Sequence, residues 1–217
     1  MGDLTRQLAD SDAGTPVDLE YVDVGGGFGV PYRAEQPPLD LAAVAAATRD
    51  AVGELPRSTG GSATLAIEPG RFVVADAGVL LTRVNTVKET ADGTVAGVDA
   101  GMTDLLRPAM YDAHHPIRNL GHDADPSPLT DSRAETSVTV AGPICESADV
   151  FCENRQLPTP TRGDVLTVGI AGAYGFEMAS QYNSRPRPAE VALQDDTSRI
   201  TRRRESLADL TQTEHPR

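Results

Sequence analysis

The 217-residue sequence has no tryptophan, only two cysteines, and a single lysine, Lys88. Two cysteines, Cys145 and Cys152, are too few for a framework of disulfide bonds, so both thiols are expected to be reduced inside a cell. The sequence contains no apolar run of membrane-spanning length and no recognisable secretory signal. These absences predict a cytoplasmic protein that does not interact with membranes.

The charge is strongly one-sided, with 32 acidic against 19 basic residues and a net charge of −13 at pH 7. Such a surface repels phosphate backbones, which argues against nucleic acid as a partner. Dense carboxylates keep a surface hydrated in concentrated salt, and the salt screens their mutual repulsion. We therefore expect a halophilic source, with an ordinary acidic protein from a GC-rich genome as the alternative.

The first third of the sequence has the pattern of a strand, a helix and a second strand. "LEYVDV" runs into three glycines, "PPLDLAAVAAATRDAVGEL" has apolar residues at helical spacing after Asp40 as a candidate N-cap, and "SATLAIEPGR" is largely apolar. A continuous apolar strand that follows a helix is typical of parallel strands buried on both faces.

A different pattern follows residue 73. The stretches "GVLLTRVNTVKET", "GTVAGVDAG", "SVTVAG" and "GDVLTVGIAGAYG" are short strands separated by Gly, Asp and Pro. This alternation is typical of an antiparallel barrel or sandwich. "PAEVAL" is expected to be the last strand, and "SRITRRRESLADLTQ" a short exposed terminal helix.

Both strands of the first unit end in turns that are rich in bare backbone, Gly25–Gly27 and Glu68–Arg71. In a (β/α)8 barrel, the loops after the last two strands commonly bind a phosphate through backbone N–H groups, and glycine lets the phosphate approach. Two tight turns without a ligand are the alternative. Pro31 follows at once, so the glycines do not open a helix as a dinucleotide-binding motif would.

Several motifs match one known family in order and spacing from about Leu19 to the tail. They are "DVGGGFGVPY", "EPGRFVVADAGVLLTRVNTVKE", "GVDAGMTDLLRPAMYDAHHPI", "VAGPICESADVF", "GDVLTVGIAGAYGFEMASQYNSRPRPAEV" and "RRRESLADL". Together they resemble the ornithine, arginine and diaminopimelate decarboxylases, which depend on pyridoxal phosphate. "CES" and "RPAMY" point to the diaminopimelate branch, with a related ornithine or arginine decarboxylase as the runner-up.

The resemblance implies a mixed fold in three parts. Residues 1–73 would be the last βαβ portion of a (β/α)8 cofactor-binding barrel, residues 74–193 a C-terminal antiparallel β-barrel domain, and residues 194–217 a terminal helix and tail. The implied reaction converts meso-2,6-diaminopimelate to L-lysine and CO₂. The implied assembly is a homodimer or a pairing with a separate N-terminal half. A non-catalytic remnant that keeps the dimer-forming domain is a further alternative.

The resemblance also assigns roles to individual residues. The residues implied to hold the cofactor are Gly26, Gly27, Glu68, Gly70, Arg71 and Tyr174. The residues implied to bind the carboxylate and amine groups of the substrate are Arg71, Arg107, Tyr111, Glu146 and Tyr174. Cys145 is implied as the proton donor, reaching into the site of the other subunit. No metal is expected, because His114, His115 and His122 have no cysteine partner at zinc spacing.

The chemistry of a decarboxylase explains these residue types. The carboxylate of Glu68 beside the pyridine nitrogen favours its protonated form, and the protonated ring is the electron sink for the carbanion. The planar guanidinium group of an arginine suits a substrate carboxylate. The thiol of Cys145 titrates near enough to neutrality to return a proton to the carbanion.

One element of the family is missing from the sequence. The family attaches its cofactor to a lysine on the first barrel strand and stacks a histidine on the ring, whereas Lys88 lies after both glycine turns and matches no such lysine. A whole (β/α)8 barrel needs about 250 residues. We therefore expect a C-terminal half that is inactive alone. A truncated gene, a late start and one half of a split enzyme remain open.

The charge balance generates the first testable prediction. If the −13 charge is an adaptation to salt, the chain should melt at a clearly higher temperature in concentrated KCl than in dilute buffer, because screening removes self-repulsion. Thermal melts followed by circular dichroism measure this difference. Equal melting temperatures in the two buffers would contradict the halophilic interpretation.

Overall fold

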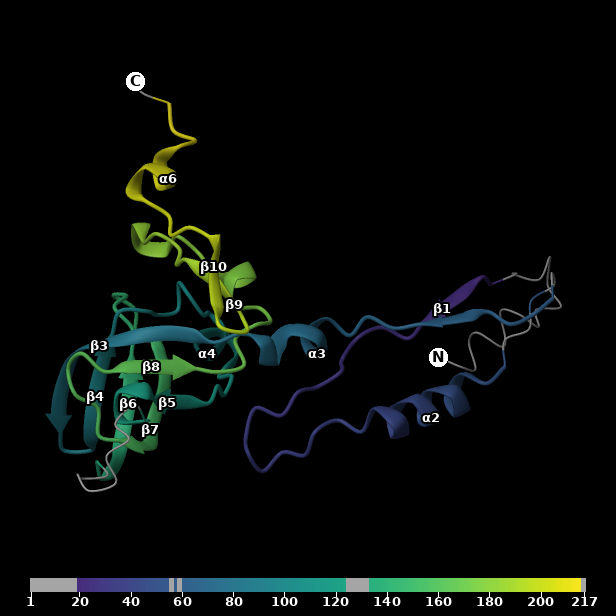
Figure 1. Cartoon of the computed structure of the whole chain (residues 1–217), viewed down its shortest axis with the longest axis horizontal. Coiled ribbons are helices and arrows are strands. Elements are labelled where there is room, and N and C mark those ends of the chain that lie inside the picture. The colour runs from purple at the N-terminus through teal and green to yellow at the C-terminus, as the bar shows by residue number, and fades with distance from the viewer. Residues whose placement is uncertain (1–18, 55–56, 58–59, 124–132, 216–217) are drawn as a thin grey trace. The chain divides into compact units, whose positions relative to one another are not determined.

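The computed structural model describes residues 19–54, 57, 60–123 and 133–215. The chain divides into two compact units, unit 1 (Met1–Val73) and unit 2 (Val74–Arg217). Figure 1 labels the helices and strands of both. Within the described ranges, no helix is both long enough and apolar enough to cross a membrane.

Unit 1 contains the expected strand, helix and strand. Strand β1 (Tyr21–Asp23) pairs in parallel with β2 (Thr64–Ala66), and helix α2 (Leu41–Val52) lies between them in the chain. Asp40 caps α2, since its Oδ1 accepts a hydrogen bond from the Ala43 N–H at 2.9 Å. The apolar contacts of unit 1 are few: Val22 and Val52 are buried, with Leu19, Val24 and Ala63 packed against them.

The expectation that both strands are buried on both faces is wrong. Tyr21 on β1 is 63% exposed, Leu65 on β2 is 39% exposed, and Ile67 just beyond β2 is 49% exposed. The apolar sequence of β2 is that of a buried strand, but the described residues of unit 1, two strands and the helix α2, do not cover both faces. The parallel pairing itself is confirmed.

Unit 2 is a six-stranded barrel, which confirms the predicted sheet domain. Its strands are β3 (Leu80–Thr90), β4 (Gly93–Val98), β5 (Ile117–Asn119), β6 (Glu135–Ala141), β7 (Val150–Pro158) and β8 (Val165–Val168). The order is β5-β8-β3-β4-β6-β7, and every pair is antiparallel except β4 with β6, which is parallel. The outermost strands, β5 and β7, contact each other, so the barrel is nearly closed.

The interior of the barrel is filled mainly by small branched side chains. Buried residues alternate along β4, as a strand with one face in a core requires. The fully buried apolar side chains include Val84, Val138, Val140, Val168 and Leu166. Valine and leucine therefore do the packing that tryptophan, which the sequence lacks, performs in other barrels.

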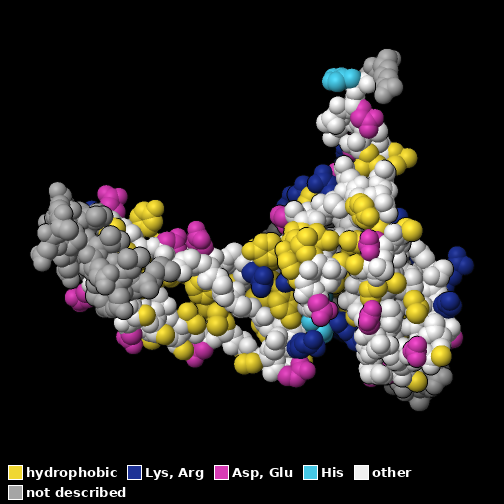
Figure 2. Space-filling model, turned by 180° about the vertical axis from the view of Figure 1, so that it is seen from behind, with side chains coloured by type: hydrophobic (Ala, Val, Ile, Leu, Met, Phe, Trp, Pro, Cys, Tyr) yellow, Lys and Arg dark blue, Asp and Glu magenta, His cyan; other side chains and the backbone are white. Residues whose placement is uncertain are grey.

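Short helical segments connect the strands. They are α3 (Gly70–Val74), η1 (Ala75–Ala77), α4 (Arg107–Tyr111), α5 (Leu120–Asp123), η2 (Phe176–Met178) and η3 (Tyr182–Ser184). On the face of the molecule shown in Figure 2, acidic side chains are scattered over both units and do not gather in one patch.

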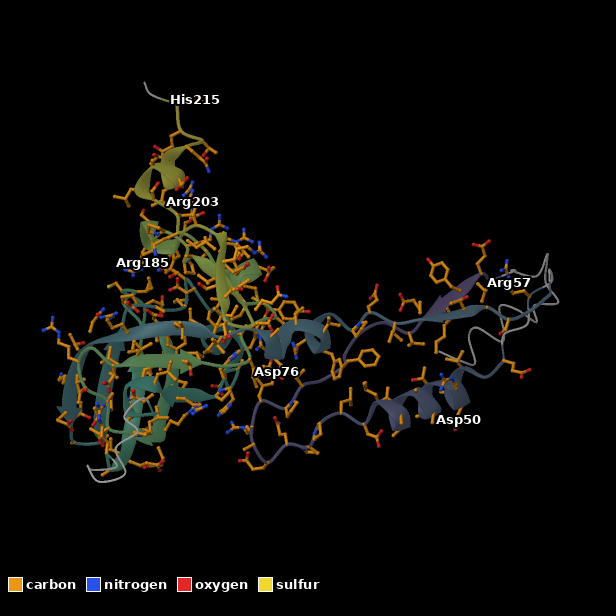
Figure 3. The ribbon with its side chains drawn as sticks, viewed as in Figure 1. Asp50, Arg57, Asp76, Arg185, Arg203 and His215 are labelled. Atoms are coloured by element: carbon orange, nitrogen blue, oxygen red, sulfur yellow. The ribbon has the colours of Figure 1, made fainter. Side chains whose placement is uncertain are left out.

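The expected terminal helix over residues 198–212 is wrong in its first half. Residues Thr197–Arg202 form strand β10, which pairs with β9 (Glu190–Gln194) as an antiparallel hairpin, and the helix α6 is confined to Leu207–Thr211. Asp195 turns the chain with a φ of 51°. A capping box of Ser206 and Asp209 starts the helix. Figure 3 labels Arg203, which forms an ion pair with Asp209 at 2.7 Å.

A buried carboxylate joins three segments of the barrel. Asp164, 8% exposed, accepts hydrogen bonds from Asn119 Nδ2 and from the Thr161 N–H, each at 2.8 Å, and pairs with Arg133. Burial alone would raise the pKa of Asp164, but the bonds from Arg133, Asn119 and Thr161 outweigh it and lower the pKa to about 2.

The lowered pKa of Asp164 generates a prediction for how the free energy of unfolding depends on pH. The pKa of Asp164 is about 2 in the folded chain against 3.8 as the reference value. The carboxylate therefore stabilises the fold fully above about pH 4 and loses this contribution as the pH falls toward 2, by up to about 2 kcal/mol. Urea unfolding at pH 6 and pH 3 should show a smaller pH effect for Asp164→Asn than for the wild type. Asp92→Asn, in the exposed turn between β3 and β4, is the control and should retain the wild-type pH effect.

Candidate functional site

The three glycines after β1 are required by the backbone for two reasons. Gly25 and Gly27 have φ angles of 79° and 88°, in the left-handed region that favours glycine. Gly26 lies so close to the other turn that a Cβ on it would stand 2.7 Å from the carbonyl oxygen of Glu68. A side chain is therefore excluded at Gly26 by contact and disfavoured at its two neighbours by conformation.

Hydrogen bonds join the two turns of unit 1 side by side. The Glu68 N–H donates to the Gly25 carbonyl at 2.9 Å, and the Gly25 N–H donates to the Asp23 carboxylate at 2.7 Å. A further bond from the Gly70 N–H to the Glu68 carbonyl, 2.9 Å long, tightens the second turn. The structure thus brings together four of the predicted cofactor residues, Gly26, Gly27, Glu68 and Gly70. Arg71 follows in the first turn of α3 and is half-buried.

In unit 2, helix α4 buries Arg107 and exposes Tyr111. Arg107 is 6% exposed and Tyr111 61% exposed, so the two side chains do not form a pair on the surface. The buried side chain of Leu105 anchors the segment before the helix. Asp112 ends the helix with a φ of 51°.

A histidine that sequence reasoning did not assign to the site supports Arg107. Nη1 of Arg107 lies 2.9 Å from Nε2 of His115, and Nδ1 of His115 lies 2.9 Å from the Gly169 carbonyl oxygen. A guanidinium group only donates and a carbonyl only accepts, so His115 is neutral with its proton on Nδ1. Burial and the positive charge of Arg107 both lower the pKa of His115, which keeps the ring in this state.

Cys145 and Glu146 lie in the loop between β6 and β7, and both are exposed. One carboxylate oxygen of Glu146 accepts a hydrogen bond from the Ala148 N–H at 3.3 Å. The other cysteine, Cys152, is buried on β7, where burial raises the pKa of its thiol. The structure therefore leaves Cys145 as the thiol that a substrate can reach.

Tyr174 is held in an unusual backbone conformation. Its φ is 59°, a value that costs a tyrosine conformational energy, and its side chain is 43% exposed. The preceding residues are tied to the segment after α3, since the Ala171 N–H donates to Gly78 at 2.8 Å and the Gly172 N–H to Ala75 at 3.0 Å. A strained residue that the fold holds in place and exposes is a candidate for function.

A hollow of about 210 Å³ lies beside this turn and is lined by none of the predicted site residues. Asp104, Gly172, Gly175 and Phe176 are part of its wall, and burial raises the pKa of Asp104. Among the described residues, no group of three or more potential ligands could hold a metal ion.

Comparison with known proteins gives consistent matches. A family model described as the C-terminal sheet domain of pyridoxal-dependent decarboxylases matches residues 33–172. A diaminopimelate decarboxylase of Methanothermobacter thermautotrophicus is 46% identical over 198 residues, which are 90% of this chain and 44% of that protein. The chain thus spans less than half the length of this curated relative.

Solved structures agree. A crystal structure of a diaminopimelate decarboxylase superposes with a TM-score of 0.84 and 36% identity, and the match covers 99% of this chain and 52% of the other. The Helicobacter pylori diaminopimelate decarboxylase in complex with L-lysine gives a TM-score of 0.76 and 40% identity, over 91% of this chain and 45% of the other.

The close approach of the two turns generates a prediction for Gly26. Gly26→Ala should push the turns apart, because the new Cβ would meet the Glu68 carbonyl at 2.7 Å. The Glu68 amide, which donates to Gly25, should then exchange its hydrogen at least about tenfold faster. Gly29→Ala is the matched control, since a Cβ there meets nothing within 4 Å. Equal exchange of the Glu68 amide in the two variants would show that the contact does not order the turns.

Proposed function

Because the chain belongs to the pyridoxal-dependent decarboxylases and carries their C-terminal sheet domain, we propose that it is the C-terminal part of a diaminopimelate decarboxylase. The proposed reaction removes one carboxyl group from meso-2,6-diaminopimelate and gives L-lysine and CO₂. One observation carries the proposal: the chain, which bears Arg107 and Tyr111 on α4 and Cys145 and Glu146 in the β6–β7 loop, is 46% identical to a protein of that name.

The residues of unit 1 fit the phosphate and ring of pyridoxal 5′-phosphate. The joined turns present bare backbone at Gly26 and Gly27, where a phosphate oxygen can approach N–H groups, and Gly70 lies beside them with its own N–H bonded to the Glu68 carbonyl. Arg71 adds a positive charge for the phosphate, and Glu68 supplies the negative charge that a protonated pyridine nitrogen requires. When bound, the cofactor supplies the electron sink that decarboxylation needs.

The residues of unit 2 bind and protonate the substrate. The guanidinium group of Arg107, oriented by neutral His115, is proposed to bind a substrate carboxylate. Tyr111 and Glu146 are proposed to bind its polar ends, Glu146 through the second amine group. Tyr174, exposed on its strained turn, is proposed to contact cofactor and substrate. Cys145 is proposed to donate the proton of its Sγ to the carbon that has lost CO₂.

Lys88, the only lysine, does not suit attachment of a cofactor. It lies exposed on β3 opposite Val95, on the barrel of unit 2. We therefore propose that the cofactor lysine belongs to the part of the relatives' length that this chain does not span. A homodimer, in which Cys145 serves the partner's site, is the proposed assembly. A module that only dimerises is the second candidate, favoured by the absence of a suitable lysine.

The proposed role of Cys145 is tested with the assembled decarboxylase. The chain is mixed with pyridoxal phosphate and the N-terminal half of the Methanothermobacter relative, and CO₂ release from meso-diaminopimelate is measured. The mixture should release CO₂, and the chain without the added half should not. Cys145→Ala should slow turnover by roughly 10²–10⁴-fold, the usual worth of a positioned acid.

Cys152→Ala is the matched control, because the second cysteine is buried in the barrel core. Its turnover should stay within a few-fold of the wild type. Equal turnover of Cys145→Ala and wild type would remove Cys145 from the chemistry. Turnover by the chain alone would contradict the proposed source of the lysine.

A further inference from the structure

A buried carboxylate next to the Cys145 loop has no role in the chemistry described above. Asp149 is 3% exposed, and its two oxygens accept hydrogen bonds from two different loops. Oδ1 accepts the N–H of Met102 at 2.6 Å, and Oδ2 accepts the N–H of Ile144 at 2.7 Å. A buried charge is costly unless it is well bonded, so such a pair of short bonds holds both amides firmly.

Two glycines make room for this carboxylate. A Cβ on Gly101 would stand 2.6 Å from Oδ1 of Asp149, and a Cβ on Gly142 would collide with the same carboxylate. Neither glycine has a positive φ. Their lack of a side chain is therefore explained by the space that the Asp149 carboxylate occupies. The three residues pack directly against one another.

The two loops that Asp149 joins carry the proposed chemistry. Ile144 immediately precedes Cys145 and Glu146, and main-chain bonds from Gly142 to Asp149 at 2.8 Å and from Asp149 to Glu146 at 3.1 Å close that loop. Met102 lies in the turn that leads through buried Leu105 into α4, which bears Arg107 and Tyr111. A single side chain thus links the thiol loop to the segment that leads into α4 of the same chain. Because Cys145 is proposed to serve the partner's site, this link positions the thiol loop on its own barrel.

We propose that Asp149 is a positioning residue, which holds the Cys145–Glu146 loop in register with the segment that enters α4. This inference rests on the proposed function for its catalytic meaning, but its structural content can be tested without substrate or cofactor. Sub-ångström placement of a proton donor is what such a carboxylate contributes, since a small displacement of a catalytic group greatly slows a reaction.

The first test compares amide hydrogen exchange in the wild-type chain and two variants. Asp149→Ala removes both acceptors, and the amides of Met102 and Ile144 should each exchange at least about tenfold faster. Asp149→Asn keeps one oxygen, so one of the two amides should remain protected. Wild-type exchange at both amides in Asp149→Ala would overturn the proposal.

Asp164→Asn is the matched control for general loss of stability. Asp164 is also a buried, hydrogen-bonded carboxylate of unit 2, but its partners Arg133, Asn119 and Thr161 lie before β6, on β5 and before β8. A nitroxide attached to exposed Cys145 reports the motion of its loop, and Cys152, 8% exposed, is shielded from the reagent. The nitroxide spectrum should sharpen in Asp149→Asn and keep the wild-type width in Asp164→Asn. Equal spectra of all three chains, or sharpening in both variants, would reduce Asp149 to a general stabilising residue.

A measurement on the unmodified chain covers the case in which the Asp149 variants fail to fold. Because both amides donate to one carboxylate, NMR couplings across the hydrogen bonds should join the amide nitrogens of Met102 and Ile144 to the carboxylate carbon of Asp149. Absence of either coupling would contradict the shared bond. None of these results depends on decarboxylation, so failure of the inference and failure of the proposed function are distinguishable.

Discussion

Hydrogen bonds from loop amides to the buried carboxylate of Asp149 are the interaction on which the proposed chemistry depends. The core of the barrel consists mainly of valine, leucine and alanine side chains, which fix the strands and, through Ala100 and Leu105, the segment before α4, but it includes neither Cys145 nor Glu146. The loops carry Cys145, Glu146 and the entry to α4, and their geometry is set by a few buried polar groups. Asp149 sets the loop of the thiol, and neutral His115 sets the guanidinium group of Arg107. Buried polar groups that are hydrogen-bonded in this way specify one arrangement where apolar packing alone would allow several.

In the glycine turns of unit 1, contacts between backbone atoms fix the geometry in a similar way. Gly26 touches the Glu68 carbonyl, and the Glu68 amide returns a bond to Gly25, so the ends of two parallel strands form one surface of bare peptide groups. Surfaces of this kind can bind phosphate through N–H groups alone, which is the role proposed for these turns. The same contact places Glu68 and Arg71, of opposite charge, beside the glycines.

Much of this was predictable from local patterns. The parallel β1–α2–β2 unit followed from apolar spacing and the Asp40 cap, and the barrel from short strands separated by turn residues. The exposure of β2 was not predictable, because its apolar sequence is typical of a strand that is buried on both faces. Residues 198–202 were expected to begin the terminal helix, whereas they follow the Asp195 turn and pair with β9 as a strand. Asp149 and His115 were missed because their roles rest on contacts with residues 47 and 54 positions away. Gly101 and Gly142, which make room for the Asp149 carboxylate, were the available signal for this contact.

The family of this chain is established. The central claim is that the substrate of the assembled decarboxylase is meso-diaminopimelate. In the decarboxylase assembled with the relative's N-terminal half, the ratio of kcat/KM for meso-diaminopimelate to that for L-ornithine tests the claim most directly. L-ornithine lacks the second carboxylate, so it would leave a charged partner in the site unpaired, and such a loss discriminates strongly. The account predicts a ratio of at least about 100 in favour of meso-diaminopimelate. A ratio near one, or a preference for L-ornithine, would contradict it.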